Sequence, residues 1–195
     1  MDADVLPAAT IFMTLYVLIL QDMLLFVKGD VRLTDTIAVS ALMAALEAAM
    51  EVSISSNRAS YTINNTCGEV EILCNLDSMV GALMNLVNNA VQSAANGVEL
   101  TINVAQVGTS QLQILIADNG PGIEKAVLEN LQEPFFTTKP QGTGLGLSVV
   151  RAVAQAHHGD FELRSQPGIG TAALLSLPLL VASKEMLKTH ENLML

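Results

Sequence analysis

The sequence predicts an α+β fold, a two-layer sandwich in which helices cover one face of a mixed β-sheet. Strand and helix patterns follow one another in mixed order, and two of the strands are adjacent and joined by a hairpin turn. With 195 residues, 51% of them hydrophobic, the chain can bury one substantial core, which excludes a disordered protein.

The predicted helices have apolar residues at three- and four-residue spacings. In residues 38–49 this pattern forms one apolar face, made by Val39, Leu42, Leu46 and Ala49. A strong helix is expected over residues 78–95, with Asp77 as its N-terminal cap, because Asp is a preferred capping residue. A short helix is expected from Glu124 and a longer one over residues 144–157.

The predicted strands are runs in which apolar and polar residues alternate. They cover residues 60–64, 70–74, 98–107, 111–117, 161–164 and 171–177. Gly108-Thr109-Ser110 joins the third and fourth runs and predicts a β-hairpin. Cys67 and Cys74 are expected to lie reduced in strands as small hydrophobic residues, since two cysteines make no disulfide scaffold and no Cys/His cluster has zinc spacing.

The charge balance narrows the possible partners. Nine Lys and Arg residues face 19 Asp and Glu residues, for a formal net charge of −10. Proteins that bind nucleic acid concentrate cations against the phosphate backbone, so no nucleic-acid partner is expected.

The first thirty residues stand apart from the rest, with a boundary expected at Lys28-Gly29-Asp30, a typical helix end. Residues 5–20 carry no charge, which is borderline for a membrane span, and the acidic start MDADV argues against a secretory signal. Three interpretations stay open: a helix covered by its own domain or by a second copy, a membrane contact through residues 5–27, or an artefact of the gene start.

Two asparagines form the first chemically suggestive motif. Asn85 and Asn89 lie four residues apart and therefore on one face of the helix predicted over residues 78–95. Their amide oxygens can coordinate a hard cation such as Mg²⁺ together with phosphate oxygens. Taken alone, the pair is explained better by a solvated polar face.

The second and third motifs follow the hairpin. Asp118-Asn119-Gly120-Pro121-Gly122 directly follows an apolar strand; a tight loop explains the glycines, but the strand-end carboxylate can also accept a hydrogen bond from an amine such as that of adenine. The segment EPFFTTKP, residues 133–140, is expected to form a flap in which Lys139 brings a point charge to a phosphate.

The fourth motif is glycine-rich and opens a predicted helix. Its glycines allow backbone N–H groups to approach an anion, and a helix N-terminus favours negative charge. It lacks both the Walker and the dinucleotide-binding spacing, so it is weak alone. The residues are Gly142, Thr143, Gly144, Leu145, Gly146 and Leu147.

In this order and spacing the four motifs resemble the N, G1, F and G2 boxes of the histidine-kinase catalytic domain, in the superfamily shared with gyrase, Hsp90 and MutL (GHKL). The resemblance covers residues 31 to about 180, including Gly168-Ile169-Gly170-Thr171, and implies a Bergerat-type ATP-binding fold. Gln92 and the very short flap between Lys139 and Gly142 resemble the nitrogen-regulator group of sensor kinases. The segments MLLFVKGD and FFTTKPQGTGLGLSVV are similar to the flagellar-regulator members of that group, which implies a role in flagellar regulation.

The resemblance implies ATP and Mg²⁺ as cofactors. Asn89 matches the family's Mg²⁺ ligand, and Asp118 matches the aspartate that contacts the adenine amine, supported by a hydrogen bond from Thr171. Gly120 and Gly122 match glycines that allow close approach. Residues that match the nucleotide- and phosphate-binding positions are Asn85, Lys139, Gly142, Thr143, Gly144, Leu145, Gly146 and Leu147.

Asn85 also distinguishes phosphoryl transfer from hydrolysis within the superfamily. The relatives that hydrolyse ATP carry Glu at this position as the base for water, whereas the amide of Asn85 takes no proton at neutral pH. Asn85, Asn89 and Lys139 are therefore the expected catalytic set, with transfer of the ATP γ-phosphoryl group to a protein side chain favoured.

The implied protein is the catalytic domain of a two-component sensor histidine kinase, a phosphotransferase. No phosphoacceptor H box precedes the domain, so the histidine must come from a dimerisation domain absent from this chain. His157, His158 and His190 all follow the fourth motif, and His157-His158-Gly159 is expected to end a helix with a cationic cap.

The expected organisation is an N-terminal apolar helix at residues 1–30, the catalytic domain at 31–182 and a tail at 183–195. Expected partners are a histidine-phosphotransfer or dimerisation domain, a response regulator of the enhancer-binding class, and a second copy of the chain. The expected location is the bacterial cytoplasm, with membrane association open. The alternatives are a non-catalytic ATP-binding regulator that docks to a full-length kinase or response regulator, and a slow ATPase, which Asn85 argues against.

Overall fold

The computed structural model describes residue 33, residues 35–94, 97–131, 133, 135–139 and 142–180. The N-terminal helix expected at residues 1–30 and the tail expected at 183–195 lie outside these residues. The described helices are α2 (Val39–Ser56), α3 (Leu76–Val91), α4 (Lys125–Asn130) and α5 (Gly146–Ala156). The described strands are β1 (Asp35–Ala38), β2 (Ser60–Asn65), β3 (Glu71–Cys74), β4 (Glu99–Val107), β5 (Gln111–Asp118), β6 (Asp160–Gln166) and β7 (Gly170–Pro178).

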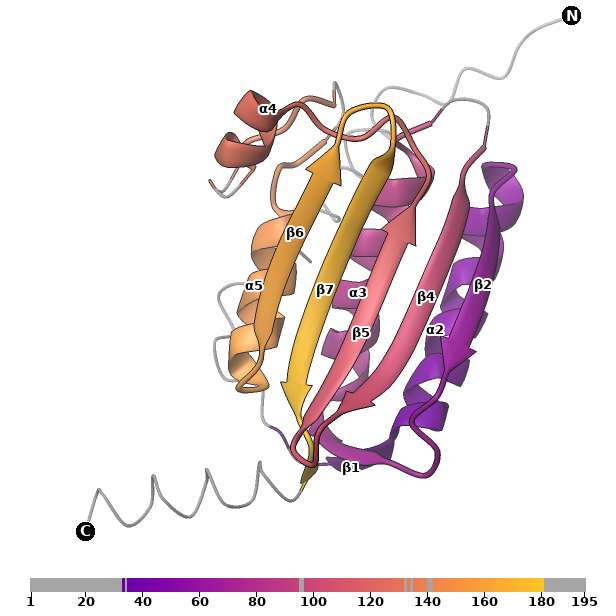
Figure 1. Cartoon of the computed structure of the whole chain (residues 1–195), viewed down its shortest axis with the longest axis vertical. Helices are drawn as coiled ribbons and strands as arrows, with labels where there is room; N and C mark the ends of the chain where they lie inside the picture. The colour runs from indigo at the N-terminus through magenta and orange to yellow at the C-terminus, as the bar shows by residue number, and fades with distance from the viewer. Residues whose placement is uncertain are drawn as a thin grey trace, which may run out of the picture.

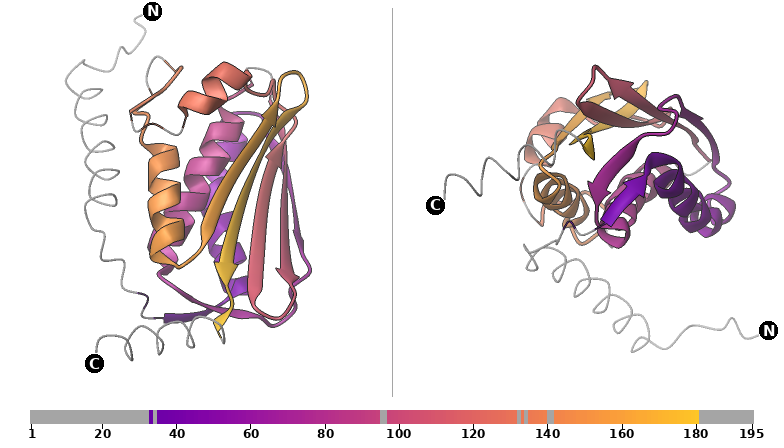
Figure 2. Two further views of the ribbon diagram at one scale, coloured as in Figure 1. Left: turned by 60° about the vertical axis from the view of Figure 1, so that its left-hand side comes forward. Right: turned by 90° about the horizontal axis from the view of Figure 1, so that it is seen from below.

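Five of these strands form one mixed sheet in the order β2-β4-β5-β7-β6 (Figure 1). Strand β2 runs parallel to β4, and every other neighbouring pair is antiparallel. Strands β1 and β3 pair separately as a two-stranded sheet. Helices α2, α3 and α5 all pack on the same face of the large sheet (Figure 2). The predicted two-layer α+β fold is confirmed.

The core lies between this helical layer and the sheet. Alternation along the strands points one residue in two toward the helices, as with Ile102 of β4 and Ile114 of β5, both buried. Leu83 of α3 and Val149 of α5, both fully buried, pack against this face. Apolar residues recur at every second position along the strands, and these are the buried positions. A shift by one residue would turn them to the exposed face, so the sheet is held in one register.

Helix α3 differs from its prediction at both ends. It begins at Leu76 and its cap is Asn75, whose side chain accepts a hydrogen bond of 3.0 Å from the main-chain N–H of Ser78. Asp77 lies inside the first turn, where its charge suits the positive end of the helix dipole. The helix ends at Val91, four residues before the predicted end.

Helix α2 is longer than predicted and its buried face is shifted. It continues to Ser56, with Met43, Met50 and Ile54 completing the buried face, whereas Ala49 is exposed. Among the described residues, α2 has the length and apolar composition of a membrane span, which core helices also reach. Strand β1, directly before α2, was not predicted, because its four residues are too few for a clear alternating pattern.

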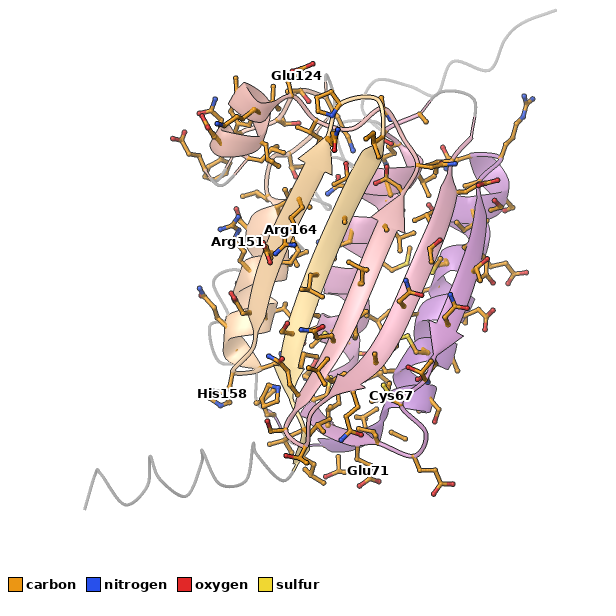
Figure 3. All side chains as sticks on the ribbon, viewed as in Figure 1. Cys67, Glu71, Glu124, Arg151, His158 and Arg164 are labelled. Carbon is orange, nitrogen blue, oxygen red and sulfur yellow. The ribbon has the colours of Figure 1, made fainter. Side chains whose placement is uncertain are left out.

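The two cysteines are buried and free, as expected, but only Cys74 lies in a strand. Cys67 follows the end of β2, at the end of the sheet where Glu71 also lies (Figure 3). Burial raises the pKa of both thiols, that of Cys74 to about 12, so both are protonated at neutral pH.

His157 is not the cationic cap that the sequence predicted. The residue is 2% exposed. Nδ1 lies 2.7 Å from the main-chain oxygen of Val153, and Nε2 accepts a hydrogen bond of 3.1 Å from the main-chain N–H of Asn75. A nitrogen that accepts carries no proton, so the ring is neutral and donates from Nδ1. His157 therefore ties the end of α5 to the cap of α3, and burial lowers its pKa.

This contact predicts a pH-dependent stability. Because the folded-state pKa of His157 is lowered, its contribution to stability is present above the ordinary histidine pKa of about 6.5 and is lost as the pH falls below it. The Tm measured by circular dichroism should fall between pH 7.5 and 5.5, and His157→Gln should remove about 3 °C of that fall. The exposed His158→Gln is the matched control, and an equal fall in both variants would contradict the assignment.

Candidate functional site

A cavity of about 510 Å³ opens at the end of the sheet where α4 lies, the end marked by Glu124 (Figure 3). It is enclosed by α3, the end of β5, the loop after it, residues 136–139, the start of α5, and strands β6 and β7. The structure brings together at this cavity all of the predicted site residues except Gly120 and Leu145.

The three asparagines of α3 divide their roles. Asn85 and Asn89 line the cavity, as their four-residue spacing predicted, and so does Asn88. The side-chain oxygen of Asn88, however, accepts a hydrogen bond of 2.7 Å from Ser53 of α2. Asn88 therefore connects α3 to α2, whereas Asn89 directs its amide oxygen toward the Lys139 ammonium at the cavity.

Asp118 ends β5 with its carboxylate at the cavity. Oδ1 accepts a hydrogen bond of 2.9 Å from the main-chain N–H of Gly120, and the main-chain N–H of Thr171 is a second donor. Burial raises the pKa of Asp118, and these two hydrogen bonds oppose the rise because they favour the charged form. The result is a fixed, half-buried hydrogen-bond acceptor.

Thr171 lies beside Asp118 because the two residues are paired in the register of β5 and β7. The sequence predicted support for Asp118 from Thr171, and the structure attributes it to the main chain. The side-chain hydroxyl of Thr171 instead lies 2.9 Å from that of Ser165 on β6. Ser165 was not predicted as a site residue, because nothing in its local sequence marks it.

Gly120 and Gly122 are close to protein atoms. A Cβ on Gly120 would lie 2.6 Å from Ser93 Oγ and 2.7 Å from Asp118 Oδ1, and one on Gly122 would lie 2.1 Å from the main-chain oxygen of Gln166. The loop after β5 is thus packed directly against Ser93, just after α3, and against the end of β6 and the β6–β7 turn. Gly120 lies behind the carboxylate and does not line the cavity.

Lys139 crosses the cavity to α3. Its ammonium donates hydrogen bonds of 3.0 Å to Asn89 Oδ1 and 3.1 Å to Gln92 Oε1, and burial lowers its pKa. A cation therefore already lies against the amide oxygen that the sequence assigned to Mg²⁺. Gln92, one turn after Asn89, is a contact that sequence spacing could have suggested.

The glycine-rich segment, residues 142–147, packs against the flap, residues 133–140, through Gly144 and Phe135. Gly144 has φ +70°, and a Cβ there would lie 2.3 Å from the main-chain carbon of Phe135, whose N–H donates to the Gly144 oxygen at 3.1 Å. Phe136 lines the cavity, whereas Phe135 is exposed. Helix α5 begins at Gly146, not at Gly144 as predicted, and Leu145 is buried beneath it.

Apolar side chains also line the cavity. Sequence patterns could not assign these residues to a site, since apolar residues on strands, helices and loops are explained equally well by the core. They are Leu86, Ile116, Ile123, Val127, Leu131, Phe136, Leu163 and Ala173.

The arrangement suits a ligand with three parts. The acceptors Asp118 and Thr171 suit a donor on a flat apolar ring, which the apolar surface can cover. Lys139 and the N-terminus of α5, whose first N–H groups have no partner within the helix, suit an anion. Among the described residues no group of three His, Cys, Asp or Glu could hold a metal, so a cation here would depend on amide oxygens and on the ligand.

Comparisons with known proteins agree with this geometry. Residues 75–181 match the family described as "Histidine kinase-, DNA gyrase B-, and HSP90-like ATPase". The chain is similar to the sensor protein kinase FleS of Pseudomonas aeruginosa, 46% identical over 163 residues, which cover 84% of this chain but only 40% of FleS.

Solved structures share the fold. The catalytic domain of the histidine kinase ThkA has a TM-score of 0.67 at 23% identity, covering 76% of this chain and 97% of that domain. The histidine kinase AdeS of Acinetobacter baumannii has a TM-score of 0.71 at 21% identity, covering 92% of this chain and 87% of that one.

Proposed function

The chain belongs to the histidine kinase-, DNA gyrase B- and HSP90-like ATPase family, and we propose on that basis that it transfers the ATP γ-phosphoryl group to a histidine. Residues 75–181 are the ATP-binding catalytic module of this family. The histidine would come from a dimerisation domain outside the described residues. The chain spans only 40% of FleS, so the transfer and the identity of its acceptor are part of this proposal.

One observation carries the proposal. A single cavity is lined by Asp118 and Thr171, by Lys139 and Asn89, which are joined by a hydrogen bond, and by apolar side chains. Adenine would occupy the acceptor end, its exocyclic amine donating to Asp118. The phosphates would lie at the other end, held by Lys139 and the main chain of residues 142–147.

The donors at the phosphate end also fit Mg²⁺. Asn89 would bind the ion, with Asn85 beside it, because Mg²⁺ takes one or two protein oxygens and completes its shell with water and phosphate. The contact between Asn89 Oδ1 and the Lys139 ammonium shows that this oxygen is already oriented toward positive charge. The ion would neutralise the charge that develops on the transferring phosphoryl group.

The cavity favours transfer over hydrolysis. Asp118 is the one carboxylate among its described lining residues, and in this proposal it binds the base and not the phosphates. Asn85 holds no proton-accepting group that could activate water. Positioning and charge stabilisation suffice for transfer to an incoming histidine.

The partners and organisation follow from the same proposal. The catalytic domain would comprise residues 31–182, preceded by an apolar helix at 1–30 and followed by a tail at 183–195. Because ATP and response regulators are cytoplasmic, the domain would act there, with a response regulator of the enhancer-binding class. Similarity to FleS favours a flagellar regulatory system.

The test supplies the missing acceptor. The chain is incubated with radiolabelled ATP, Mg²⁺ and the separately purified dimerisation domain of a FleS-like kinase. Acid-labile phosphate is expected on that domain and is expected to disappear with Asn89→Ala. Steady release of phosphate without labelled protein would instead support an ATPase, and nucleotide binding without either would support the non-catalytic regulator.

Lys139 provides a second test. Lys139→Ala removes the cation at the phosphate end, so the affinity for ATP measured by calorimetry should fall about tenfold, a charge-assisted hydrogen bond being worth roughly 1.5–3 kcal/mol. Lys125→Ala is the matched control, because Lys125 is exposed on α4 and does not line the cavity. Equal affinity for the two variants would argue against Lys139 as a phosphate ligand.

A further inference from the structure

Ser165 stands behind the base end of the cavity without lining it. Its neighbour Arg164 is exposed and pairs with Glu162 on the outer face of β6 (Figure 3). Alternation along the strand therefore turns Ser165 inward, toward β7 and the loop after β5. There its hydroxyl makes three contacts, each of 2.9 Å, with the Ile123 N–H, the Gly170 oxygen and the Thr171 hydroxyl.

These three contacts allow only one assignment of protons. A serine hydroxyl has one hydrogen and two lone pairs. The Gly170 carbonyl can only accept, so it takes the Ser165 hydrogen; the Ile123 N–H can only donate, so it takes one lone pair. The second lone pair remains for Thr171, which must therefore donate its own hydroxyl hydrogen to Ser165.

This assignment of protons determines which ligand groups the cavity wall can pair with. With its hydrogen directed at Ser165, the Thr171 hydroxyl presents only lone pairs to a ligand. The neighbouring Asp118 carboxylate also only accepts when it is ionised. The wall formed by Asp118 and Thr171 can thus pair with a donor, such as an amino group, and cannot pair with a carbonyl oxygen.

We propose that Ser165 is a positioning residue that orients the Thr171 hydroxyl as an acceptor and thereby selects purines with an amino group, rather than a carbonyl, at carbon 6. This inference rests on the proposed function, because it assumes that the base lies against Asp118 and Thr171. It assigns specificity to a side chain that does not touch the ligand.

The test compares ADP with IDP, which differ at this position by an amino group and a carbonyl. Dissociation constants are measured by calorimetry with Mg²⁺ at pH 8, where carboxylates are ionised. Wild type should prefer ADP by about ten- to a hundredfold. Ser165→Ala releases the Thr171 hydrogen to donate to the IDP carbonyl, so the preference should fall about three- to tenfold.

Two controls isolate the effect. Ser165→Thr keeps the hydroxyl and should keep the preference, and Ser60→Ala removes an exposed serine hydroxyl from β2 and should change nothing. A merely structural role for Ser165 would weaken ADP and IDP equally, leaving their ratio unchanged. That result would overturn the inference.

Thr171→Val keeps the test decisive if Ser165→Ala does not fold. It removes the hydroxyl while retaining the main-chain N–H that supports Asp118, so it too should reduce the preference for ADP. An unchanged preference in this variant would overturn the inference. Failure of wild type to bind either nucleotide would overturn the proposed function and the inference with it, whereas ADP binding without selectivity would overturn the inference alone.

Discussion

Asp118→Asn is expected to reduce the affinity for ADP or a non-hydrolysable ATP analogue by at least about a hundredfold. The carboxylate is held by the Gly120 and Thr171 main-chain N–H groups so that its remaining lone pairs face the cavity. An amide in its place presents an NH₂ group toward the adenine amine, so that two buried hydrogen-bond donors face one another without an acceptor. Such mismatches cost roughly 1–3 kcal/mol each.

The same variant should be more stable than wild type without ligand. Burial raises the pKa of Asp118, so the folded state favours the protonated form and loses stability as the pH rises through that pKa. Asn carries no charge and avoids this cost at pH 7. We expect its Tm to exceed that of wild type by about 2–4 °C at pH 7, and the difference to shrink toward pH 4.

Asp160→Asn is the matched control, because Asp160 is an exposed residue at the start of β6 whose carboxylate only caps the N–H of Phe161. It should bind nucleotide like wild type. Calorimetry and thermal unfolding are measured on wild type, Asp118→Asn and Asp160→Asn. Retained binding by Asp118→Asn would show that the carboxylate does not recognise the base.

Gly122→Ala is expected to destabilise the domain by about 3–5 kcal/mol and to abolish nucleotide binding. Gly122 has φ +70°, which costs any other residue roughly 1–2 kcal/mol, and its new Cβ would lie 2.1 Å from the Gln166 main-chain oxygen. Backbone atoms cannot move aside like a side chain. The loop after β5 would separate from the β6–β7 turn, to which the Gly168 N–H also binds it through the Pro121 oxygen at 2.7 Å.

Gly108→Ala separates the cost of the positive φ from the cost of the clash with Gln166. Gly108, in the β4–β5 turn, has a similar φ of +61° but no atom within 4 Å of a Cβ. This variant should lose only about 1–2 kcal/mol and bind nucleotide normally. Urea unfolding gives the two free energies, and equal losses would show that the contact with Gln166 is not what requires glycine at position 122.

Much of the fold and site could be predicted because the information is local. The β4–β5 hairpin is visible in its alternation and turn, and Asn85 and Asn89 share a helix face through spacing alone. The glycine-rich segment and Lys139 are equally plain in the sequence. Helix ends were less accurate, since Asn75 and Asp77 are both good caps and only packing selects between them.

The sequence by itself determined the α+β class and the four motifs, whose resemblance to the histidine-kinase boxes predicts a nucleotide site. Only the tertiary structure decided how distant residues share protons and charge. His157 is neutral because Asn75, 82 positions away, donates to it, and Ser165 orients Thr171 because two strands meet in one register. Hydrogen-bond direction and burial depend on partners remote in sequence, which no local pattern of residues specifies.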